Sequence, residues 1–576
     1  MPIHNEDIAA HFEEIADLLE IKGDNPFRIR AYRNGARAVR ALPRSAAELL
    51  KGGEDLTRYP DIGEALATKI AELLRTGTTQ AMENLRRQIP SSLEDLLRIP
   101  GLGPVRIRTL WHELGITDLD ALEAAARAGR LRGLPGFGPK TEQKVLAAIE
   151  EHRKKKRRFL RSVAAEYGEP LADWLRAGRG VREVVIAGSY RRGRDTVGDL
   201  DVLAVAPDRS DVMTRFAGYE EVAEVVSLGP TRATVVLRCG LQVDLRRVRP
   251  ESFGSALQYF TGSKAHSIQL RRRAQERGLK INEYGVFRDE RRIAGDTEES
   301  VYAAVDLPWI PPELREARGE IEAAERGRLP RLVEPGDIRG ELHCHTTATD
   351  GRADLEAMAL AARQRGLEYL AITDHSQRLT MVGGLDADAL ARQIETIDRL
   401  NERLTGITLL KGVECDILED GRLDLPDAVL ARLDLVVGAV HSHFELSRRA
   451  QTDRILRAMD HPHFTLLAHP TGRLIGERPP YDVDLDRLIR HAAERGCFLE
   501  LNSQPRRLDL DDLACMKARE AGVLVAIDTD AHSERDLDLR IHGVLQARRG
   551  WLEAGDVLNT RPLAELRPLL ARTMGR

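Results

Sequence analysis

The sequence predicts a multidomain protein with a helical N-terminal region, an α+β middle domain and a C-terminal distorted β/α barrel. The chain has 576 residues, which is far more than one core accommodates, so three to five domains are expected. Near Val181 the apolar periodicity changes from the helical to the strand type. In the last 240 residues, short apolar runs are followed by side chains of the metal-ligand type, as at the strand ends of a barrel.

Composition restricts the class of protein. The formal net charge of −4 indicates no overall affinity for nucleic acid, so any basic contact surface is local. The basic run at 153–158 is such a surface or else a solvated helix face. Five cysteines without close C-x-x-C pairs indicate free thiols in a reducing compartment. With neither a signal peptide nor a long apolar run, we expect a cytoplasmic protein and no membrane partner.

The N-terminal region is predicted to be helical and to contact a phosphate backbone. Two amphipathic stripes lie within residues 4–50, and three related turns of the apolar-x-Gly-x-Gly type or a close variant follow at 59–64, 99–104 and 134–140. Glycines let backbone N–H groups at the start of the next helix approach a phosphate oxygen, whatever the base sequence. One such turn is often only structural, but three are a stronger signal. The candidate DNA contacts are Gly101, Gly103, Gly136, Gly138 and Lys140.

The middle domain carries a candidate carboxylate metal site. Asp199 and Asp201 open an apolar strand, and the two-residue period of a strand places both carboxylates on one face. Asp244 lies in another strand-like run, which could bring a third oxygen donor. Such a set suits Mg²⁺ or Mn²⁺ together with substrate phosphates. A solvated strand end would explain Asp-x-Asp alone, but the preceding turn offers Gly188, Ser189 and Arg192 for a triphosphate.

These segments, together with Tyr259-Phe-Thr-Gly-Ser263, resemble the nucleotidyltransferase core of family X DNA polymerases, including polymerase beta. The resemblance covers most of residues 5–315. It implies that Asp199 and Asp201 bind two metal ions, and that Asp244 binds the catalytic ion and promotes deprotonation of the primer 3′-hydroxyl. The residues implied to border the incoming nucleotide are Gly188, Ser189, Arg192, Tyr259, Phe260 and Gly262, and Arg271 falls near the template strand.

The sequence departs from the family at two places. Lys264 and Ser267 stand where polymerase beta has an acidic residue and an asparagine beside the base, so nucleotide selection could differ. Lys69 matches the Schiff-base lysine that removes 5′-deoxyribose phosphate. The neighbouring lysines of that site are replaced by Arg28, Asn34 and Ala65, so lyase chemistry and a merely solvated lysine both stay open.

The C-terminal region contains nine side chains of the metal-ligand type, most of them after an apolar run. They are His343, His345, Asp350, His375, Glu414, His441, His469, Asp530 and His532. Over residues 338–576 they resemble the polymerase-and-histidinol-phosphatase (PHP) domain. Mixed imidazole and carboxylate donors favour Mn²⁺, Zn²⁺ or Fe²⁺, and nine donors indicate a cluster of up to three ions with a bridging carboxylate such as Glu414. Phosphoester hydrolysis is the implied reaction. His443, Arg473 and Asn502 are weaker candidates for the phosphate or site contacts.

The expected domains are an N-terminal lyase-like region at 1–85, a helix-hairpin-helix region at 86–158, a nucleotidyltransferase palm at 159–250, a nucleotide-binding thumb at 251–318, a linker at 319–337 and the PHP domain at 338–576. The leading hypothesis is a monomeric DNA repair polymerase that fills short gaps and carries a 3′–5′ exonuclease, with abasic-site cleavage a further activity. Its partners would be gapped or primed DNA and deoxynucleoside triphosphates. Three alternatives stay open: fusion to a small-molecule phosphatase, a template-independent nucleotidyltransferase and a non-catalytic scaffold.

Overall fold

A computed structural model describes residues 3–42, 44–90, 92–97, 99, 101–154 and 158–576. The chain divides into two compact units, residues Met1–Arg157 and Arg158–Arg576, which are described separately below. Half of the basic run at 153–158, residues 155–157, falls outside the described residues, so its contact with DNA stays a prediction. Among the described residues, no helix combines the length and apolar character needed to cross a membrane.

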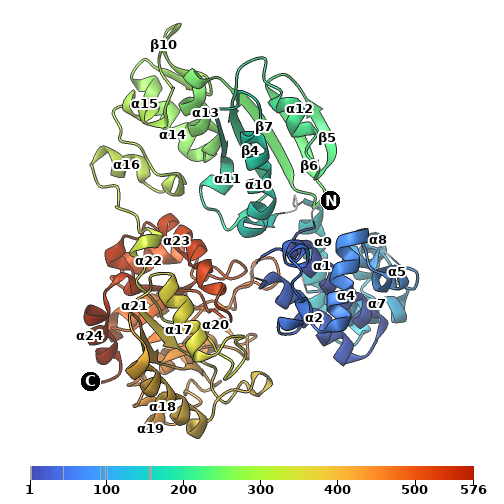
Figure 1. The fold of residues 1–576 in the computed structure, drawn as a ribbon, viewed down its shortest axis with the longest axis vertical. Helices are drawn as coiled ribbons and strands as arrows, with labels where there is room; N and C mark the ends of the chain where they lie inside the picture. The colour runs from blue at the N-terminus through green and yellow to red at the C-terminus, as the bar shows by residue number, and fades with distance from the viewer. Residues whose placement is uncertain (1–2, 43, 91, 98, 100, 155–157) are drawn as a thin grey trace. The chain divides into compact units, whose positions relative to one another are not determined.

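The first unit is helical, as predicted, and is coloured blue to cyan in Figure 1. Both predicted stripes are buried in its core, the first including Phe12 and the second Tyr32, whose rings lie 5.7 Å apart. The Gly-containing turns at 59–64, 99–104 and 134–140 each lead into a helix. The helices are α1 (Asn5–Lys22), α2 (Pro26–Arg40), α3 (Ala46–Lys51), α4 (Glu64–Thr76), α5 (Gln80–Arg86), α6 (Leu93–Leu96), α7 (Pro104–Leu114), α8 (Leu119–Arg127) and α9 (Pro139–Lys154).

The second unit begins with a five-stranded sheet in the order β2-β4-β7-β6-β5. Only β4 and β7 run parallel; the other neighbours are antiparallel. Helices α10 and α12 pack against one face, and α13 against the other, as the green part of Figure 1 shows. The elements are β1 (Phe159–Leu160), α10 (Arg161–Arg176), β2 (Glu183–Ile186), α11 (Gly188–Arg191), β3 (Thr196–Val197), β4 (Asp199–Val205), α12 (Val212–Ala217), β5 (Val222–Leu228), β6 (Arg232–Leu237), β7 (Gln242–Val248) and α13 (Phe253–Thr261).

A small subdomain follows, with a three-stranded antiparallel sheet beside two helices. Its elements are α14 (Lys264–Glu276), β8 (Lys280–Asn282), β9 (Gly285–Arg288), β10 (Arg291–Ala294) and α15 (Glu298–Ala303). Residues 319–337, assigned to a linker in the sequence, contain α16 (Glu320–Glu325) and bury Ile321 and Leu332 in the same core. Arg315 and Glu320 are fully buried as well, each in an ion pair. The passage is therefore packed, and its charged residues hide this in the sequence.

The C-terminal part is the predicted β/α barrel. Parallel strands form the sheets β11-β12-β13 and β14-β15-β16-β17-β18, and β13 and β14 are parts of one run interrupted at Gly412. Parallel bridges from His375 to Glu414 and from Cys344 to Ala531 join the sheets into a ring. The strands are β11 (Gly340–Glu341), β12 (Tyr369–Ile372), β13 (Thr408–Lys411), β14 (Glu414–Asp416), β15 (Val437–Ala439), β16 (Leu466–Leu467), β17 (Phe498–Asn502) and β18 (Val525–Asp528).

Helices on the outside of the barrel connect most successive strands, and two more follow the last strand (Figure 1). They are α17 (Leu355–Gln364), α18 (Ala387–Arg403), α19 (Asp427–Leu430), α20 (Arg448–Met459), α21 (Leu485–Arg495), α22 (Asp512–Glu520), α23 (Arg540–Arg549) and α24 (Leu563–Thr573). Because parallel strands joined by helices all end at one face, the loops after the strands meet there. The fold thus places the residues after each apolar run in one region.

Candidate metal centres

The three palm carboxylates lie on the parallel strand pair at the centre of the five-stranded sheet. In its register Asp201 is opposite Asp244, and Asp199 is opposite Gln242. Asp244 accepts hydrogen bonds from Thr234 Oγ1 at 2.5 Å and from Gln242 Nε2 at 2.8 Å, which orient its carboxylate. Burial, then the charges of Asp199 and Asp244, raise the pKa of Asp201 to about 6. Carboxylates crowded in this way form a site that favours a divalent cation.

The turn from β2 into α11 lies directly against this group. Gly188 has a φ of +61°, and a Cβ atom there would lie 2.5 Å from Asp201 Oδ2. Only glycine meets both demands without strain, since other residues rarely adopt this φ and the carboxylate leaves no space. The turn therefore brings the following backbone and Ser189 beside the carboxylates, where a triphosphate would share their metal ions.

The predicted nucleotide residues surround this turn. Arg192 is 14% exposed; its Nη1 donates to Thr261 O at 2.6 Å and its Nε donates to Glu316 at 3.0 Å. A Cβ atom at Gly262 would lie 3.3 Å from Arg192 Nη1, so the α13 end approaches the guanidinium closely.

Three further predicted contact residues lie at this end of the helix or beyond it. The rings of Tyr259 and Phe260 meet edge to face at 5.0 Å, and Tyr259 is 37% exposed. Arg271, on α14, donates through Nε to the carbonyl of Ser267 in its own helix. The structure thus gathers Arg192, Tyr259, Phe260 and Gly262 around the turn, whereas for Arg271 it shows only this contact within its helix.

The helical unit holds the predicted DNA-contact residues at its turns. Gly101 and Gly136 have φ values of +89° and +78°, and Gly103 is the N-cap of α7, with no side chain capping its first N–H groups. Gly138 precedes α9, on which Lys140 is exposed. These turns leave helix N-termini available to an anion.

The candidate lyase residue, Lys69, is half-buried on α4. Its Nζ donates to Ala65 O at 3.2 Å and lies 5.9 Å from the centre of the Tyr32 ring. These are the contacts of a lysine lying along its own helix, so the lyase role stays a prediction.

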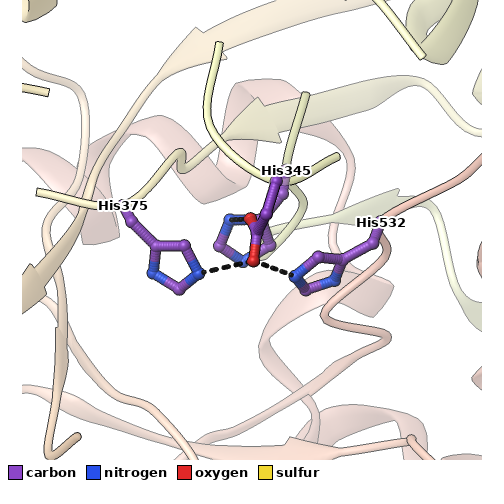
Figure 2. Close-up of side chains that lie close together, drawn as sticks. His345, His375 and His532 are labelled. Carbon is purple, nitrogen blue, oxygen red and sulfur yellow. Dashed lines mark ion pairs between the residues drawn. The ribbon is translucent and has the colours of Figure 1, made fainter. Parts of the chain in front are cut away.

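All nine predicted PHP ligands are brought together at one end of the barrel. Figure 2 shows the rings of His345, His375 and His532 turned toward one another; His375 and His532 pair with Asp350 at 3.5 and 3.3 Å. On the other side of His345, Asp530 lies 3.1 Å from its Nε2. These donors come from loops after different strands, as the barrel geometry requires.

Glu414, which begins β14, lies at the centre of the group. Its carboxylate oxygens lie 2.6 Å from His375 Nδ1, 3.0 Å from His469 Nε2, 3.2 Å from His441 Nε2, 3.5 Å from His343 Nε2 and 3.6 Å from His345 Nε2. One buried carboxylate surrounded by five imidazoles could contribute to more than one ion, and its predicted role as a bridge stays a prediction.

The residues present fit a group of metal ions. His343 Nε2, His345 Nδ1 and Glu414 Oε2 are buried, and none has a hydrogen-bond partner among the described residues. Buried polar atoms in proteins are normally satisfied, so orphaned donors and acceptors aimed at one another indicate a bound ion. Three overlapping sets have their ligand atoms within 4.8 Å of one another: His345–Asp350–His375–His532, His343–His345–Asp530 and His375–Glu414–His441.

The protonation of the imidazoles reflects the neighbouring carboxylates. Burial would lower the pKa of His375, but Glu414 and Asp350 outweigh it and raise the pKa to about 10. By the same balance the pKa values of His441 and His532 rise to about 9. Burial and the charges of His532 and His375 lower the pKa of His345 to about 4. Since imidazoles bind metal in the neutral form, metal uptake by this site releases protons.

A second layer of carboxylates supports the ligands, and the sequence analysis did not identify it. Glu500 on β17 accepts from His343 Nδ1 at 2.5 Å and from the backbone N–H of His469 at 2.6 Å. Asp416 lies 3.3 Å from His441 Nδ1. Asp374 accepts from Thr346 and Thr349 and so orders the loop that carries Asp350. The sequence does carry one signal for this layer, because a carboxylate inside an apolar strand, such as Glu500 in β17, is rare unless it is paired.

The three weaker candidates have different surroundings. Asn502 donates to Asp530 Oδ2 at 3.1 Å and therefore belongs to the site. The guanidinium of Arg473 donates to the carbonyls of Arg507 and Leu508, which occupies two of its donors. His443 is exposed and lines a cleft of about 370 Å³ beside the site.

Family comparisons agree with this architecture. A helix-hairpin-helix domain matches residues 3–79, a SAM-like helix-hairpin-helix tandem 93–151, the DNA polymerase beta thumb 256–316 and the PHP domain 341–504. A Bacillus subtilis protein named DNA polymerase/3′–5′ exonuclease PolX is 39% identical over 577 residues, which span 99% of this chain and 100% of that protein.

Two shorter relatives match about a third of the chain. A protein of Caldanaerobacter subterraneus named probable phosphatase is 32% identical over 204 residues, covering 33% of this chain and 75% of its own length. A protein of Thermoanaerobacter with the same description is 28% identical over 231 residues, covering 38% of this chain and 89% of its own length.

Proposed function

Because the chain belongs to the PolX family, the family X DNA polymerases that carry a PHP domain, we propose that it fills short gaps in DNA during repair and trims 3′ ends with its own 3′–5′ exonuclease. The observation that carries the polymerase role is the register of β4 and β7, which holds Asp201 opposite Asp244 with Gly188 closed against them. Asp199, Asp201 and Asp244 are the proposed ligands of Mg²⁺ or Mn²⁺. Ions held there would stabilise the attacking and leaving oxygens of an in-line displacement.

The chain's own residues have distinct proposed tasks in synthesis. Asp244, oriented by Thr234 and Gln242, faces the primer 3′-hydroxyl and favours its deprotonation. Ser189 and Arg192 hold the triphosphate, with the main chain at Gly188 close to it. Tyr259, Phe260 and Gly262 border the sugar at the end of α13. Arg271 is proposed to approach the template strand.

The hairpin turns are proposed to hold the DNA backbone. The proposed contacts are Gly101, Gly103, Gly136, Gly138 and Lys140. Helix N-termini bind phosphate through backbone N–H groups, so this grip is independent of base sequence, as gap filling requires. The predicted monomeric state and cytoplasmic location are kept with this proposal.

The second proposed activity is hydrolysis of the 3′-terminal phosphodiester at the PHP site. The nine donors are proposed to hold Mn²⁺, Zn²⁺ or Fe²⁺, up to three ions, with Glu414 as the bridge. Ions held there would activate water and neutralise the charge on the phosphoester as the alkoxide departs. The chain's part is to fix the donors: Glu500 orients His343, Asp416 orients His441, and Asp374 holds the loop of Asp350.

The test is a labelled primer on one-nucleotide-gapped DNA with Mg²⁺ or Mn²⁺. Asp199→Ala should abolish extension and leave shortening, whereas His343→Ala should abolish shortening and leave extension. If wild-type protein neither extends nor shortens the primer, the proposed function is wrong.

A phosphatase of small phosphoesters is the second candidate for the PHP site, because the two shorter relatives that match a third of the chain are named as probable phosphatases. Rapid hydrolysis of a free phosphomonoester without any shortening of primed DNA would favour it. A non-catalytic scaffold, another of the alternatives, predicts that Asp244→Ala retains full repair function.

A further inference from the structure

A buried set of charges joins the nucleotide-binding turn of the palm to helix α23 of the PHP domain. One oxygen of Glu316, Oε1, accepts from Arg192 Nε at 3.0 Å and from Arg549 Nη1 at 2.9 Å. Arg549 Nη1 also donates to the main-chain carbonyl of Arg192 at 2.8 Å. The Arg549 side chain is 2% exposed, so a residue 357 positions away in the chain contacts the turn out of solvent.

The same helix supports the turn by packing. A Cβ atom at Gly193 would lie 3.6 Å from Arg549 Cδ and 3.7 Å from Leu545 Cβ. Arg549 is in turn fixed within the PHP domain, since its Nη2 donates to Asp512 on α22 at 2.5 Å. Asp512 also accepts from Arg318, which precedes α16. The guanidinium of Arg549 therefore bonds through Nη2 within its own domain and through Nη1 to the turn and to Glu316.

We propose that Arg549 is a positioning residue for nucleotide binding at the polymerase site: it holds the Gly188–Arg194 turn in place and neutralises Glu316 when the guanidinium of Arg192 turns to the triphosphate. This inference rests on the proposed role of Arg192. It gives the PHP domain a task in synthesis that is separate from its own hydrolytic site.

The charge balance supports this role. If Arg192 left Glu316 to bind a triphosphate, a carboxylate that is 11% exposed would be stranded close to an incoming polyanion. A buried unpaired charge is costly. Arg549 remains at 2.9 Å as its counter-ion, whereas Arg194 is farther, at 3.8 Å. Without Arg549, Glu316 would retain Arg192 more strongly and repel the triphosphate.

The experiment uses the full chain and steady-state gap filling with a single deoxynucleoside triphosphate. Arg549→Ala should raise the KM for the nucleotide about tenfold, the equivalent of one charge-assisted hydrogen bond, with kcat changed by less than about twofold. The matched control is Arg548→Ala on the same helix: Arg548 bonds to Glu313 and to Val333 O, not to the turn, so KM should not change. Arg549→Lys keeps the charge and should restore part of the affinity.

Three further measurements separate the possible failures. Primer shortening by the PHP site should be unchanged in Arg549→Ala; equal losses of extension and shortening would mean that Arg549 only holds the fold together, which overturns the proposal. Arg192→Ala should raise KM by itself. If the KM of Arg192→Ala is unchanged, the proposed nucleotide contact is wrong and this inference with it. If the KM of Arg192→Ala rises but that of Arg549→Ala does not, only the positioning role of Arg549 is wrong. In the double variant the two effects should add less than fully, because part of the Arg549 effect acts through Arg192.

Discussion

Glu500→Gln should weaken metal activation of the exonuclease without touching the polymerase. Glu500 is fully buried on β17 and accepts from His343 Nδ1 at 2.5 Å and from His469 N–H at 2.6 Å. Burial would lower the pKa of His343, but the charges of Glu500, Asp530 and Glu414 outweigh it and raise the pKa well above its usual value. The hydrogen bond on Nδ1 leaves Nε2 of His343 facing the cluster, which is the tautomer that a metal ion needs.

The magnitude follows from the bonds that the substitution removes. A glutamine keeps the shape but not the charge, and its NH₂ group would face either an imidazole or a backbone N–H donor. One charge-assisted hydrogen bond in such a site is worth about 1.5–3 kcal/mol. Since about 1.4 kcal/mol is a factor of ten, the loss corresponds to roughly 10- to 100-fold in metal affinity or activity.

The assay is the rate of primer shortening as a function of Mn²⁺ concentration, with primer extension in the same preparation as the measure of intact fold. The midpoint of metal activation should move upward by roughly 10- to 100-fold. The matched control is Glu494→Gln on α21, whose side chain is 75% exposed and bonds to no ligand. An unchanged midpoint in Glu500→Gln, or an equal shift in the control, would refute the reasoning.

The remaining predictions concern the turn, the pH dependence and the lysine. Gly188→Ala should reduce primer extension at least about tenfold and leave shortening intact, because its Cβ would collide with Asp201. Protein treated with a chelator should lose thermal stability as the pH rises from about 6.5 to 10. The raised pKa values of residues such as His375 favour the folded state only while the imidazole is protonated. Mn²⁺-loaded protein should not lose stability over this range. Borohydride should trap no more 5′-deoxyribose phosphate DNA on wild type than on Lys69→Ala, because lysines that assist this chemistry are replaced.

The convergence of the candidate metal ligands could be predicted because it follows local rules. In a parallel barrel each strand ends at the same face, so a histidine or carboxylate directly after an apolar run converges with the others without further information. Asp199 and Asp201 likewise share a face through the two-residue period of β4. The placement of Asp244 opposite Asp201 required only that the two runs be neighbours, which the structure bears out.

The supporting residues could not be predicted, because their partners are distant in the chain. Glu500 lies 157 positions from His343, and Arg549 lies 233 positions from Glu316. A charged residue in a strand or helix is usually solvated, and only the tertiary fold shows that these are buried and paired. The same cause hid the packing of 319–337. Glu320 looks hydrophilic in the sequence, but in the structure it pairs with His266 inside the core.

The two sites differ in donor chemistry, and this difference lets one chain carry opposed reactions. Three carboxylates without imidazoles bind a hard ion weakly and need the triphosphate to complete its shell, so the polymerase site is assembled by its own substrate. Glu414 and the surrounding imidazoles would instead supply most of an ion's donors from the protein alone, a mixed donor set that suits borderline ions. Synthesis then depends on nucleotide supply while hydrolysis does not, so a low nucleotide concentration by itself favours trimming over extension of the same primer end.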